Sequence, residues 1–237
     1  MLHHRLSIQD GEILKQAYCD LIFLLDRNYP KKSALTFVAN HYTLNSTQRN
    51  ILNRAALPLN LVQTIQSNLL NDYDLLKGRN FHVDVYNQLI TFFSIINHDP
   101  VIICRDGVLR DIFSSLHSKK DLKVDREFLV PYFNLLLKLQ PCNIHFYFDK
   151  QRSYSKNHAR LFLQLLKEFS ITGSCELHSA VDWKLKIQKE EVIMSHDTAV
   201  LIGTQCCFDF FSWLLSIKFS QSISQQFVID FLNITCF

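Results

Sequence analysis

Short hydrophobic runs that end on aspartate alternate with helical patterns over the last two thirds of the chain. Three of them are Phe81–Asp84, His145–Asp149 and Val192–Asp197. This alternation predicts a parallel sheet with helices packed on both faces. Because the carboxyl ends of parallel strands meet at one edge of such a sheet, we expect Asp84, Asp149 and Asp197 to lie close together there.

The length and charge of the chain limit what it can be. With 237 residues, of which 48% are hydrophobic, it can form one large domain or two small ones with a buried core. The net charge of +3 is too small to indicate nucleic-acid binding by itself, so a polyanion would need a local basic patch.

The cysteines and the apolar segments indicate the redox state and the cellular location to expect for this chain. Seven cysteines without a Cys-x-x-Cys pair support neither a zinc ribbon nor a redox motif, and most of them are predicted to be small core residues. The start of the chain lacks the pattern of a secretory signal, and the apolar stretch Cys206–Phe219 is too short to cross a bilayer. We therefore expect a reduced, cytoplasmic protein without a membrane segment.

The first part of the chain is predicted to be helical only. Helices are expected at Asp10–Asp26, at Lys32–Tyr42 and after Asn45, where a capping residue is followed three positions later by Gln48. A further helix is expected within Leu59–Leu76. Lys77-Gly78-Arg79 follows as a hinge, which predicts a helical domain at residues 1–76 and an α/β domain at residues 77–237.

Strands and helices alternate after this hinge. Strands are predicted at Phe81–Val85, Val101–Cys104, Asn143–Phe148, Ser174–His178, Glu191–Ser195 and Phe227–Leu232. The segments between them include predicted helices at Tyr86–Ile96, Arg126–Leu139 and Lys156–Phe169. The expected fold class is α/β, with a parallel sheet flanked by helices.

A group of carboxylates at a strand edge suits a divalent cation. Mg²⁺ commonly binds one or two carboxylates, several waters and substrate phosphates. Two ions about 4 Å apart can stabilise both the attacking and the leaving oxygens of a phosphodiester. We expect Asp84, Asp149 and Asp197 to bind Mg²⁺ or Mn²⁺. The alternative is that each aspartate only caps the next helix, and Asp197, before Thr198, suits that role.

Arg105–Asp111 gathers charges around a tight-turn signal, Asp106-Gly107. Asp106 or Asp111 would complete the acidic group, and Arg110 would contact phosphate. The alternative is a charged hairpin with internal ion pairs.

The segment after Asp149 is rich in cations and small polar residues: Lys150, Arg152, Ser153, Ser155 and Lys156. The serines are good N-cap residues, and free N–H groups at a helix start attract phosphate. Tyr154, in the same segment, can stack on a base. We expect this segment to bind substrate, and the alternative is a solvated helix entrance.

Residues 33–54 have the spacing of a helix, a short turn and a second helix. In a helix-turn-helix the second helix would present polar side chains to DNA: Thr47, Gln48, Arg49, Asn50, Asn53 and Arg54. Most helix pairs of this kind are packing units, so a DNA-binding regulator stays an alternative.

Several segments resemble an uncharacterised prokaryotic family in which a helical domain of unknown function, DUF434, precedes a PIN-like domain. Ala17–Leu35 and His41–Arg49 resemble the helical domain. Asp84-Val-Tyr-Asn87 resembles an Asp-Gly-Tyr-Asn motif of the family, and Asp106–Asp111 resembles Asp-Gly-Phe-Leu-Arg-Asp. Asp149–Ser155 and His196-Asp197 also have counterparts there.

The resemblance implies a function as well as a fold. PIN-like domains are α/β nucleases, usually of RNA, with clustered acids and divalent metal ions. The implied acidic site consists of Asp84, Asp106, Asp111, Asp149 and Asp197, supported by Asn87 and Arg110. The chain departs from the family at Val85, where a glycine is expected, and at Ile202, where a further acid is expected. We therefore expect a metal-dependent nuclease that prefers RNA to DNA, and a non-catalytic binding protein that uses the same cleft is the alternative.

Overall fold

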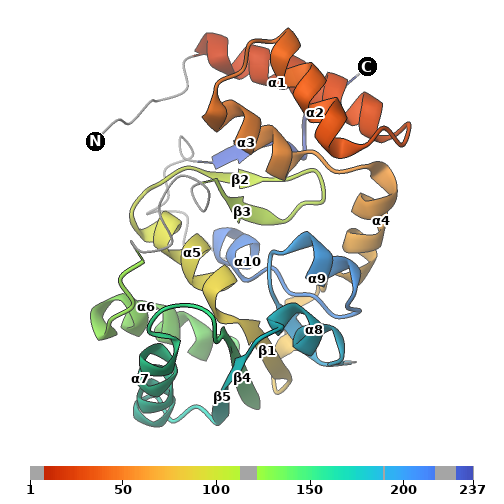
Figure 1. The fold of residues 1–237 in the computed structure, drawn as a ribbon. Helices are drawn as coiled ribbons and strands as arrows, with labels where there is room; N and C mark the ends of the chain where they lie inside the picture. Colours follow the sequence, from red (N-terminus) through yellow and green to blue (C-terminus); the bar gives the residue numbers. More distant parts are fainter. Residues whose placement is uncertain (1–7, 113–121, 189, 217–227, 237) are drawn as a thin grey trace.

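The computed structural model describes residues 8–112, 122–188, 190–216 and 228–236. Helices at the top of Figure 1 cover a small sheet in the middle of the molecule, and a larger sheet lies at the bottom. The chain is therefore an α/β protein with a helical N-terminal region, as predicted.

The N-terminal region contains four α-helices and a short 3-10 helix: α1 (Ile8–Leu25), α2 (Lys31–His41), α3 (Ser46–Ala55), α4 (Leu59–Asn68) and η1 (Tyr73–Leu76). Asn45 caps α3 with a capping box, since its side chain accepts from the Gln48 backbone and the Gln48 side chain accepts from Asn45. The predicted start signal is thus confirmed. The predicted helical stretch Leu59–Leu76 is interrupted, because α4 ends at Asn68 and only η1 follows.

Four parallel strands form the larger sheet in the order β5-β4-β1-β6. They are β1 (Asn80–Asp84), β4 (Asn143–Asp149), β5 (Gly173–His178) and β6 (Val192–Met194). One face carries an aromatic core that includes Phe81, Phe146 and Phe148. Tyr147 and Ile193 belong to a smaller cluster together with Val181, Leu185 and Val200 from the helices that follow β5 and β6. The sheet is thus packed on both faces.

Six helices accompany these strands: α5 (Val85–Ile96), α6 (Arg126–Leu137), α7 (Ser155–Glu168), α8 (Val181–Lys186), α9 (Thr198–Ile202) and α10 (Phe210–Ser216). Three of them match the helices predicted between strands. The short helix α8 was not predicted, because it is not long enough to show a clear helical period.

The remaining strands form a separate sheet in the order β3-β2-β7, made of β2 (Val101–Ile103), β3 (Leu109–Asp111) and β7 (Val228–Asp230). Strands β2 and β3 are antiparallel, and Gly107, with φ +84°, lies in the turn between them. The Asp106-Gly107 turn signal therefore marks a hairpin. Strands β2 and β7 are two of the six predicted strands, and Phe227, where the last prediction began, lies outside the described residues.

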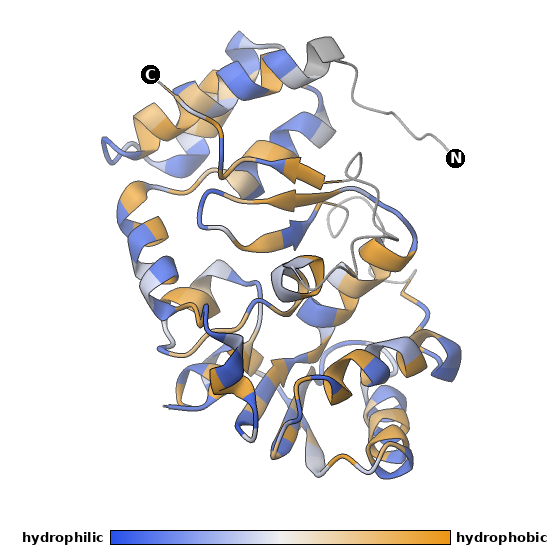
Figure 2. Cartoon of the chain, turned by 180° about the vertical axis from the view of Figure 1, so that it is seen from behind, coloured by the Kyte–Doolittle hydropathy of each residue, from blue (hydrophilic) through white to orange (hydrophobic). Residues whose placement is uncertain are grey.

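The hydrophobic core of the N-terminal helices continues into this second sheet. Buried residues of α1, α2 and α3 form one cluster with Ile102, Cys104, Ile112 and Phe231. The strands of the sheet are coloured mainly hydrophobic in Figure 2. The boundary proposed at residue 76 stays a prediction, but the packing crosses it, because residues in and beside the second sheet belong to the same buried cluster as these helices.

A disulfide joins the two ends of the described chain. Cys19 in α1 is bonded to Cys236, with 5.3 Å between their Cα atoms. The prediction of reduced cysteines is therefore wrong for this pair, which the spacing in the sequence did not reveal because 217 positions separate the two residues. Cys104 and Cys207 are buried core residues, as predicted. None of the described helices has the length and apolarity needed to cross a bilayer.

Candidate active site

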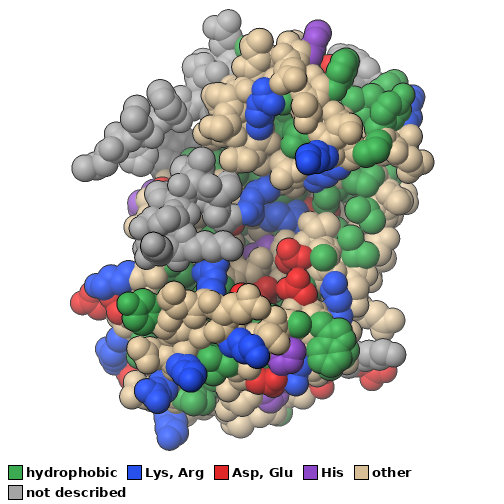
Figure 3. Space-filling view, viewed as in Figure 1, with side chains coloured by type: hydrophobic (Ala, Val, Ile, Leu, Met, Phe, Trp, Pro, Cys, Tyr) green, Lys and Arg blue, Asp and Glu red, His purple; other side chains and the backbone are tan. Residues whose placement is uncertain are grey.

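An open cavity of about 790 Å³ lies at the carboxyl edge of the larger sheet and beneath the N-terminal helices. Five aspartates line it: Asp84, Asp111, Asp149, Asp182 and Asp197. Three cations line it as well: Arg54, Arg152 and Lys186. Acidic side chains gather at this hollow in Figure 3. The lining residues come from both sheets and from the helical region, so the whole fold contributes to the cavity.

The three strand-ending aspartates meet as the sequence predicted. Asp84 ends β1, Asp149 ends β4 and Asp197 follows β6, and β1 pairs in parallel with both other strands. Asp84 and Asp197 also cap α5 and α9, since they accept backbone N–H groups of Asn87 and of Ala199. Capping is thus confirmed for these two residues, whereas metal binding stays a prediction.

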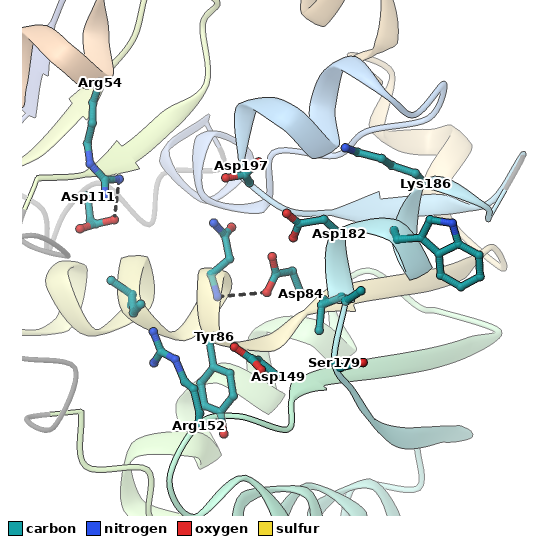
Figure 4. Close-up of a pocket in the computed structure, with 15 residues that line it drawn as sticks. Arg54, Asp84, Tyr86, Asp111, Asp149, Arg152, Ser179, Asp182, Lys186 and Asp197 are labelled. Atoms are coloured by element: carbon teal, nitrogen blue, oxygen red, sulfur yellow. Dashed lines mark hydrogen bonds and ion pairs between the residues drawn. The ribbon is translucent and has the colours of Figure 1, made fainter. Parts of the chain in front are cut away.

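Asp182 joins this group and was not predicted. It lies in α8, directly after β5, and the same strand-edge rule that selected the other aspartates applies to it. Figure 4 shows the carboxylates of Asp84, Asp182 and Asp197 pointing into the same space, with Asp149 below them. Its neighbour Trp183 also lines the cavity. Neither Asp182 nor Trp183 was predicted, because three residues separate Asp182 from the end of β5 at His178.

The grouping of carboxylates changes how they hold their protons. Burial, together with repulsion from Asp182 and Asp197, raises the pKa of Asp84 to about 7. Burial and repulsion from Asp197 and Asp149 also raise the pKa of Asp182, against the opposing effect of Lys186. Mutual repulsion among these carboxylates therefore disfavours the state in which all of them are ionised.

Arg54 reaches the cavity from the helical region. Its Nη1 lies 3.2 Å from Oδ2 of Asp111, which ends β3. Figure 4 shows this pair at one end of the cavity, apart from Asp84 and Asp182. Asp111, at 5% exposure, thus belongs to the cavity as predicted, with a cation from the N-terminal helices as its partner.

The polar residues of α3 face other parts of the molecule more than solvent. Gln48 is buried in the capping box, and Arg49 donates to the Leu44 carbonyl and to Asn40. Arg54 lines the acidic cavity. Three of the six side chains expected to read DNA therefore have structural partners or a place in the cavity, while DNA binding itself stays a prediction.

The segment after Asp149 contributes one side chain to the cavity. Arg152 lines it, and its guanidinium lies 4.5 Å from the ring centre of Tyr86. Lys150, Ser153 and Lys156 are exposed but are not among the lining residues, and Ser155 is buried. These four residues are therefore not part of the cavity lining, and their contact with substrate stays a prediction.

The predicted serine caps are also corrected in detail. Tyr154, with φ +63°, occupies the N-cap position of α7, and no side chain caps this helix. Tyr154 is 73% exposed and is not among the lining residues. The left-handed backbone at Tyr154 directs the chain into the helix without the help of Ser153.

Asp106 and Arg110 are not part of the cavity, contrary to prediction. Arg110 donates from Nη1 and Nη2 to the two carboxylate oxygens of Asp106, at 2.8 and 2.6 Å. The two side chains are 1% and 4% exposed. An aspartate and an arginine that satisfy each other inside the protein cannot contact a metal ion or a phosphate in the cavity.

Arg110 and Asn87 instead support the segment that carries Asp197. Arg110 Nε donates to the carbonyl of His196 at 2.9 Å, and the His196 N–H donates to Oδ1 of Asn87 at 2.6 Å. The buried His196 ring lies 3.4 Å from Oδ1 of Asp209, whose pKa the histidine lowers against the opposing effect of burial. The backbone before Asp197 is thus held from two sides.

The donor atoms around the cavity suit a hard cation. The lining contains carboxylates, one amide and the hydroxyl-bearing Tyr86 and Ser179, and neither histidine nor cysteine. Oxygen ligands of this kind fit Mg²⁺ or Mn²⁺ better than Zn²⁺. Within the described part of the chain, no three His, Cys, Asp or Glu side chains form a group that could hold a metal ion by themselves. A cation here would therefore take at most two direct carboxylate ligands, with water or substrate completing its shell.

Two family models match this chain. One, described as a domain of unknown function, DUF5616, covers residues 73–213, more than half of the chain. The chain belongs to the DUF5616 family. The second model, a protein of unknown function, DUF434, covers residues 13–67 and confirms that part of the predicted resemblance.

The DUF5616 chain has a curated relative in Methanocaldococcus jannaschii, an uncharacterised protein. The two are 27% identical over 188 residues, which cover 79% of this chain and 88% of the relative. No solved structure matches the chain. All five cavity aspartates lie within the DUF5616 segment, whereas Arg54 lies in the DUF434 segment.

The two expected departures from the family motifs are apolar residues that pack outside the cavity lining. Val85 is 1% exposed and packs in the main core at the start of α5. Ile202 ends α9 and packs against a hydrophobic cluster that includes Val62 and Ile65 of α4. Neither residue lines the cavity, so the group of five aspartates is present without a further acid at position 202.

Proposed function

We propose that this protein is a metal-dependent nuclease with a PIN-like second domain, and that it hydrolyses phosphodiester bonds of RNA. The observation that carries the proposal is the convergence of Asp84, Asp149, Asp182 and Asp197 from four separate segments at one sheet edge. Burial, and to a smaller extent repulsion from Asp182 and Asp197, raises the pKa of Asp84, so its charged form is costly here. A divalent cation would remove this cost, and the resemblance to PIN-like sequences supports the same conclusion.

Asp84 is the cavity aspartate whose negative charge a bound cation would stabilise most. Its oxygens accept from the Asn87 N–H and the Ser195 hydroxyl, both at 3.3 Å, and among the described residues no Lys, Arg or His forms an ion pair with it. Asp84 would hold Mg²⁺ or Mn²⁺ with Asp149, Asp182 or Asp197, directly or through water. Such an ion would supply an activated water and would stabilise the charge that develops on phosphate.

The cations of the cavity have separate parts in this proposal. Arg152, held over the Tyr86 ring, and Lys186 would bind phosphates of the substrate strand. Arg54 neutralises Asp111 and leaves the other four carboxylates for the cation. Cations and carboxylates thus line one cavity together, as binding of a polyanion through a metal ion requires.

The test compares Asp84→Asn with the unmodified protein in an RNA cleavage assay with Mn²⁺ and a mixed RNA pool. Asparagine keeps an oxygen that caps α5, so the fold is retained while the charge is lost. We expect cleavage to fall at least about 100-fold. Asp74→Asn is the matched control, because Asp74 is exposed and does not line the cavity.

Binding of the same RNA is measured separately in the presence of a chelator. Cleavage that is retained in Asp74→Asn and lost in Asp84→Asn supports the enzyme. RNA that binds without cleavage under any divalent ion overturns it in favour of a non-catalytic binding protein that uses the same cavity.

A further inference from the structure

An exposed tryptophan stands in the wall of the acidic cavity. Trp183 is 57% exposed, although its helix α8 is anchored by Val181 and Leu185, which are 9% and 0% exposed. Both anchors pack in the cluster on the face of the sheet below α8. Attachment of the helix therefore does not require the indole ring, and an aromatic surface of this size next to Asp182 is available to a ligand.

The orientation of this ring is set before any ligand arrives. The His178 ring stacks with the indole at 6.0 Å between centres and 16° between planes. His178 is fixed in turn, because its Nδ1 accepts the Ala180 N–H at 3.0 Å. A third flat ring can extend this stack, at little cost in side-chain entropy because the tryptophan is already ordered.

A cationic side chain lies on the same side of α8 as Trp183. Lys186, three residues after Trp183, also lines the cavity, as helical spacing places it on the same face. Its aliphatic stem lies against the backbone of Gly203, since a Cβ there would be only 2.8 Å from Cδ and 2.9 Å from Cε of Lys186. Because Gly203 has no side chain, the lysine stem can pack against the end of α9.

We propose that Trp183 stacks on an unpaired base of the substrate and that Lys186 contacts a phosphate next to that base. The inference rests on the proposed function and adds the class of substrate, a single-stranded nucleic acid. Every base offers a π face to an aromatic side chain, whereas a base inside a duplex already has neighbours on both faces. A ring and a cation within one helical turn match the base and phosphate of one nucleotide.

Fluorescence tests the stacking directly. The chain has two tryptophans, and the other one, Trp213, is 7% exposed in the aromatic core. We expect a 12-residue single-stranded RNA, added with a chelator, to quench the fluorescence of the unmodified protein. Trp183→Phe should lose this quenching, and a blunt duplex of the same sequence should cause none. Single-stranded DNA of the same sequence is the parallel arm that identifies the preferred sugar.

Affinity provides the second measurement. Trp183→Ala should weaken binding of the single strand by about 5- to 150-fold, the range for loss of one stacked base. The same substitution should not change binding of an oligomer with abasic residues, because that oligomer has no base to stack. Phe37→Ala is the matched control, since Phe37 is 69% exposed and lies outside the cavity.

The outcomes separate this inference from the proposed function. Equal affinity of Trp183→Ala and the unmodified protein for the single strand, or equal losses with intact and abasic oligomers, overturns the stacking. Mn²⁺-dependent cleavage that persists in that case leaves the nuclease in place. Quenching by the single strand without cleavage under any divalent ion supports the stacking and overturns the nuclease.

Discussion

Arg110 and Asp106 form a bidentate ion pair, at 2.8 and 2.6 Å, in the buried hairpin next to the acidic cavity. The pair binds the turn of the hairpin to the backbone of His196, which Arg110 also contacts. Asp106 and Arg110, which the sequence suggested as active-site residues, thus have a structural role and do not line the cavity.

Loss of Asp106 should destabilise the protein strongly. Asp106→Ala leaves the Arg110 guanidinium buried without its counter-charge, which typically costs about 3–5 kcal/mol. Urea unfolding of this variant against the unmodified protein measures the difference. Asp74→Asn is the control and should change the free energy of unfolding by less than about 0.5 kcal/mol. A loss below about 1 kcal/mol for Asp106→Ala would contradict the role assigned to the pair.

The raised pKa of Asp84 predicts a pH-dependent effect of Asp84→Asn on stability. Between about pH 4 and pH 7 the folded protein holds a proton on Asp84 that the unfolded chain has released. The stability contribution of this carboxyl therefore falls as the pH rises through this window, and asparagine has no such loss. We expect Asp84→Asn to become more stable than the unmodified protein by roughly 2 kcal/mol at pH 8, after allowance for solvent screening.

Urea unfolding of both proteins at pH 4, 5.5, 7 and 8, without divalent ions, measures this difference. The two free energies of unfolding should approach each other at pH 4. A difference that does not change with pH would show that Asp84 titrates as an ordinary carboxyl.

The strand-edge rule accounts for most of the site. It placed Asp84, Asp149 and Asp197 together because each follows a strand of the same parallel sheet, and alternation of hydrophobic runs determines those strands. It was less successful with Arg105–Asp111, where a run of charges does not show which side chains pair internally. Only the packing shows that Asp111 reaches the cavity while Asp106 is buried with Arg110.

Long-range contacts explain the remaining differences. The division into two sheets depends on the pairing of β2 with β7, which more than 100 residues separate, and local periodicity contains no information on such pairing. The same is true of Arg54 in α3, which reaches Asp111 in β3, and of the bond between Cys19 and Cys236. Local patterns predict elements and strand ends, whereas partners across the fold depend on the whole chain.

Arg152 should contribute one phosphate contact to binding of single-stranded RNA. Log affinity falls with log salt by about 0.7 for each phosphate neutralised on a single strand. Arg152→Gln is therefore expected to reduce this slope by about 0.7, measured by fluorescence anisotropy between 50 and 300 mM KCl with a chelator. Arg126→Gln is the control, because Arg126 is an exposed residue paired with Glu168 outside the cavity. Identical slopes for Arg152→Gln and the unmodified protein would place Arg152 outside the phosphate path.

Gly203 should act on RNA binding through Lys186. A methyl group in Gly203→Ala must displace the lysine stem, while the backbone at 203, with φ −89°, accepts alanine. We expect a loss of affinity no larger than that of Lys186→Gln. In the Lys186→Gln background, Gly203→Ala should have no further effect, because the displaced side chain is already gone. Additive losses in the double variant would show that Gly203 acts independently of Lys186.

The disulfide between Cys19 and Cys236 should stabilise the helical region. Cys236→Ser removes a cross-link that restricts the unfolded chain, for which the usual loss is about 2–4 kcal/mol. Urea unfolding without reductant should show this loss. With dithiothreitol the variant and the unmodified protein should unfold at the same urea concentration. A loss that persists in dithiothreitol would assign the effect to packing of Cys236.

The way the last described strand completes the N-terminal core has a consequence for synthesis. Tyr18 in α1 donates to the carbonyl of Phe231, 213 residues later, and both side chains belong to one buried cluster. At about 5–20 residues per second, a ribosome takes about 10–40 s to travel between them. During that time the apolar faces of α1, α2 and α3 lack part of their cover. Nascent chains of this protein should therefore be bound by chaperones until β7 has emerged.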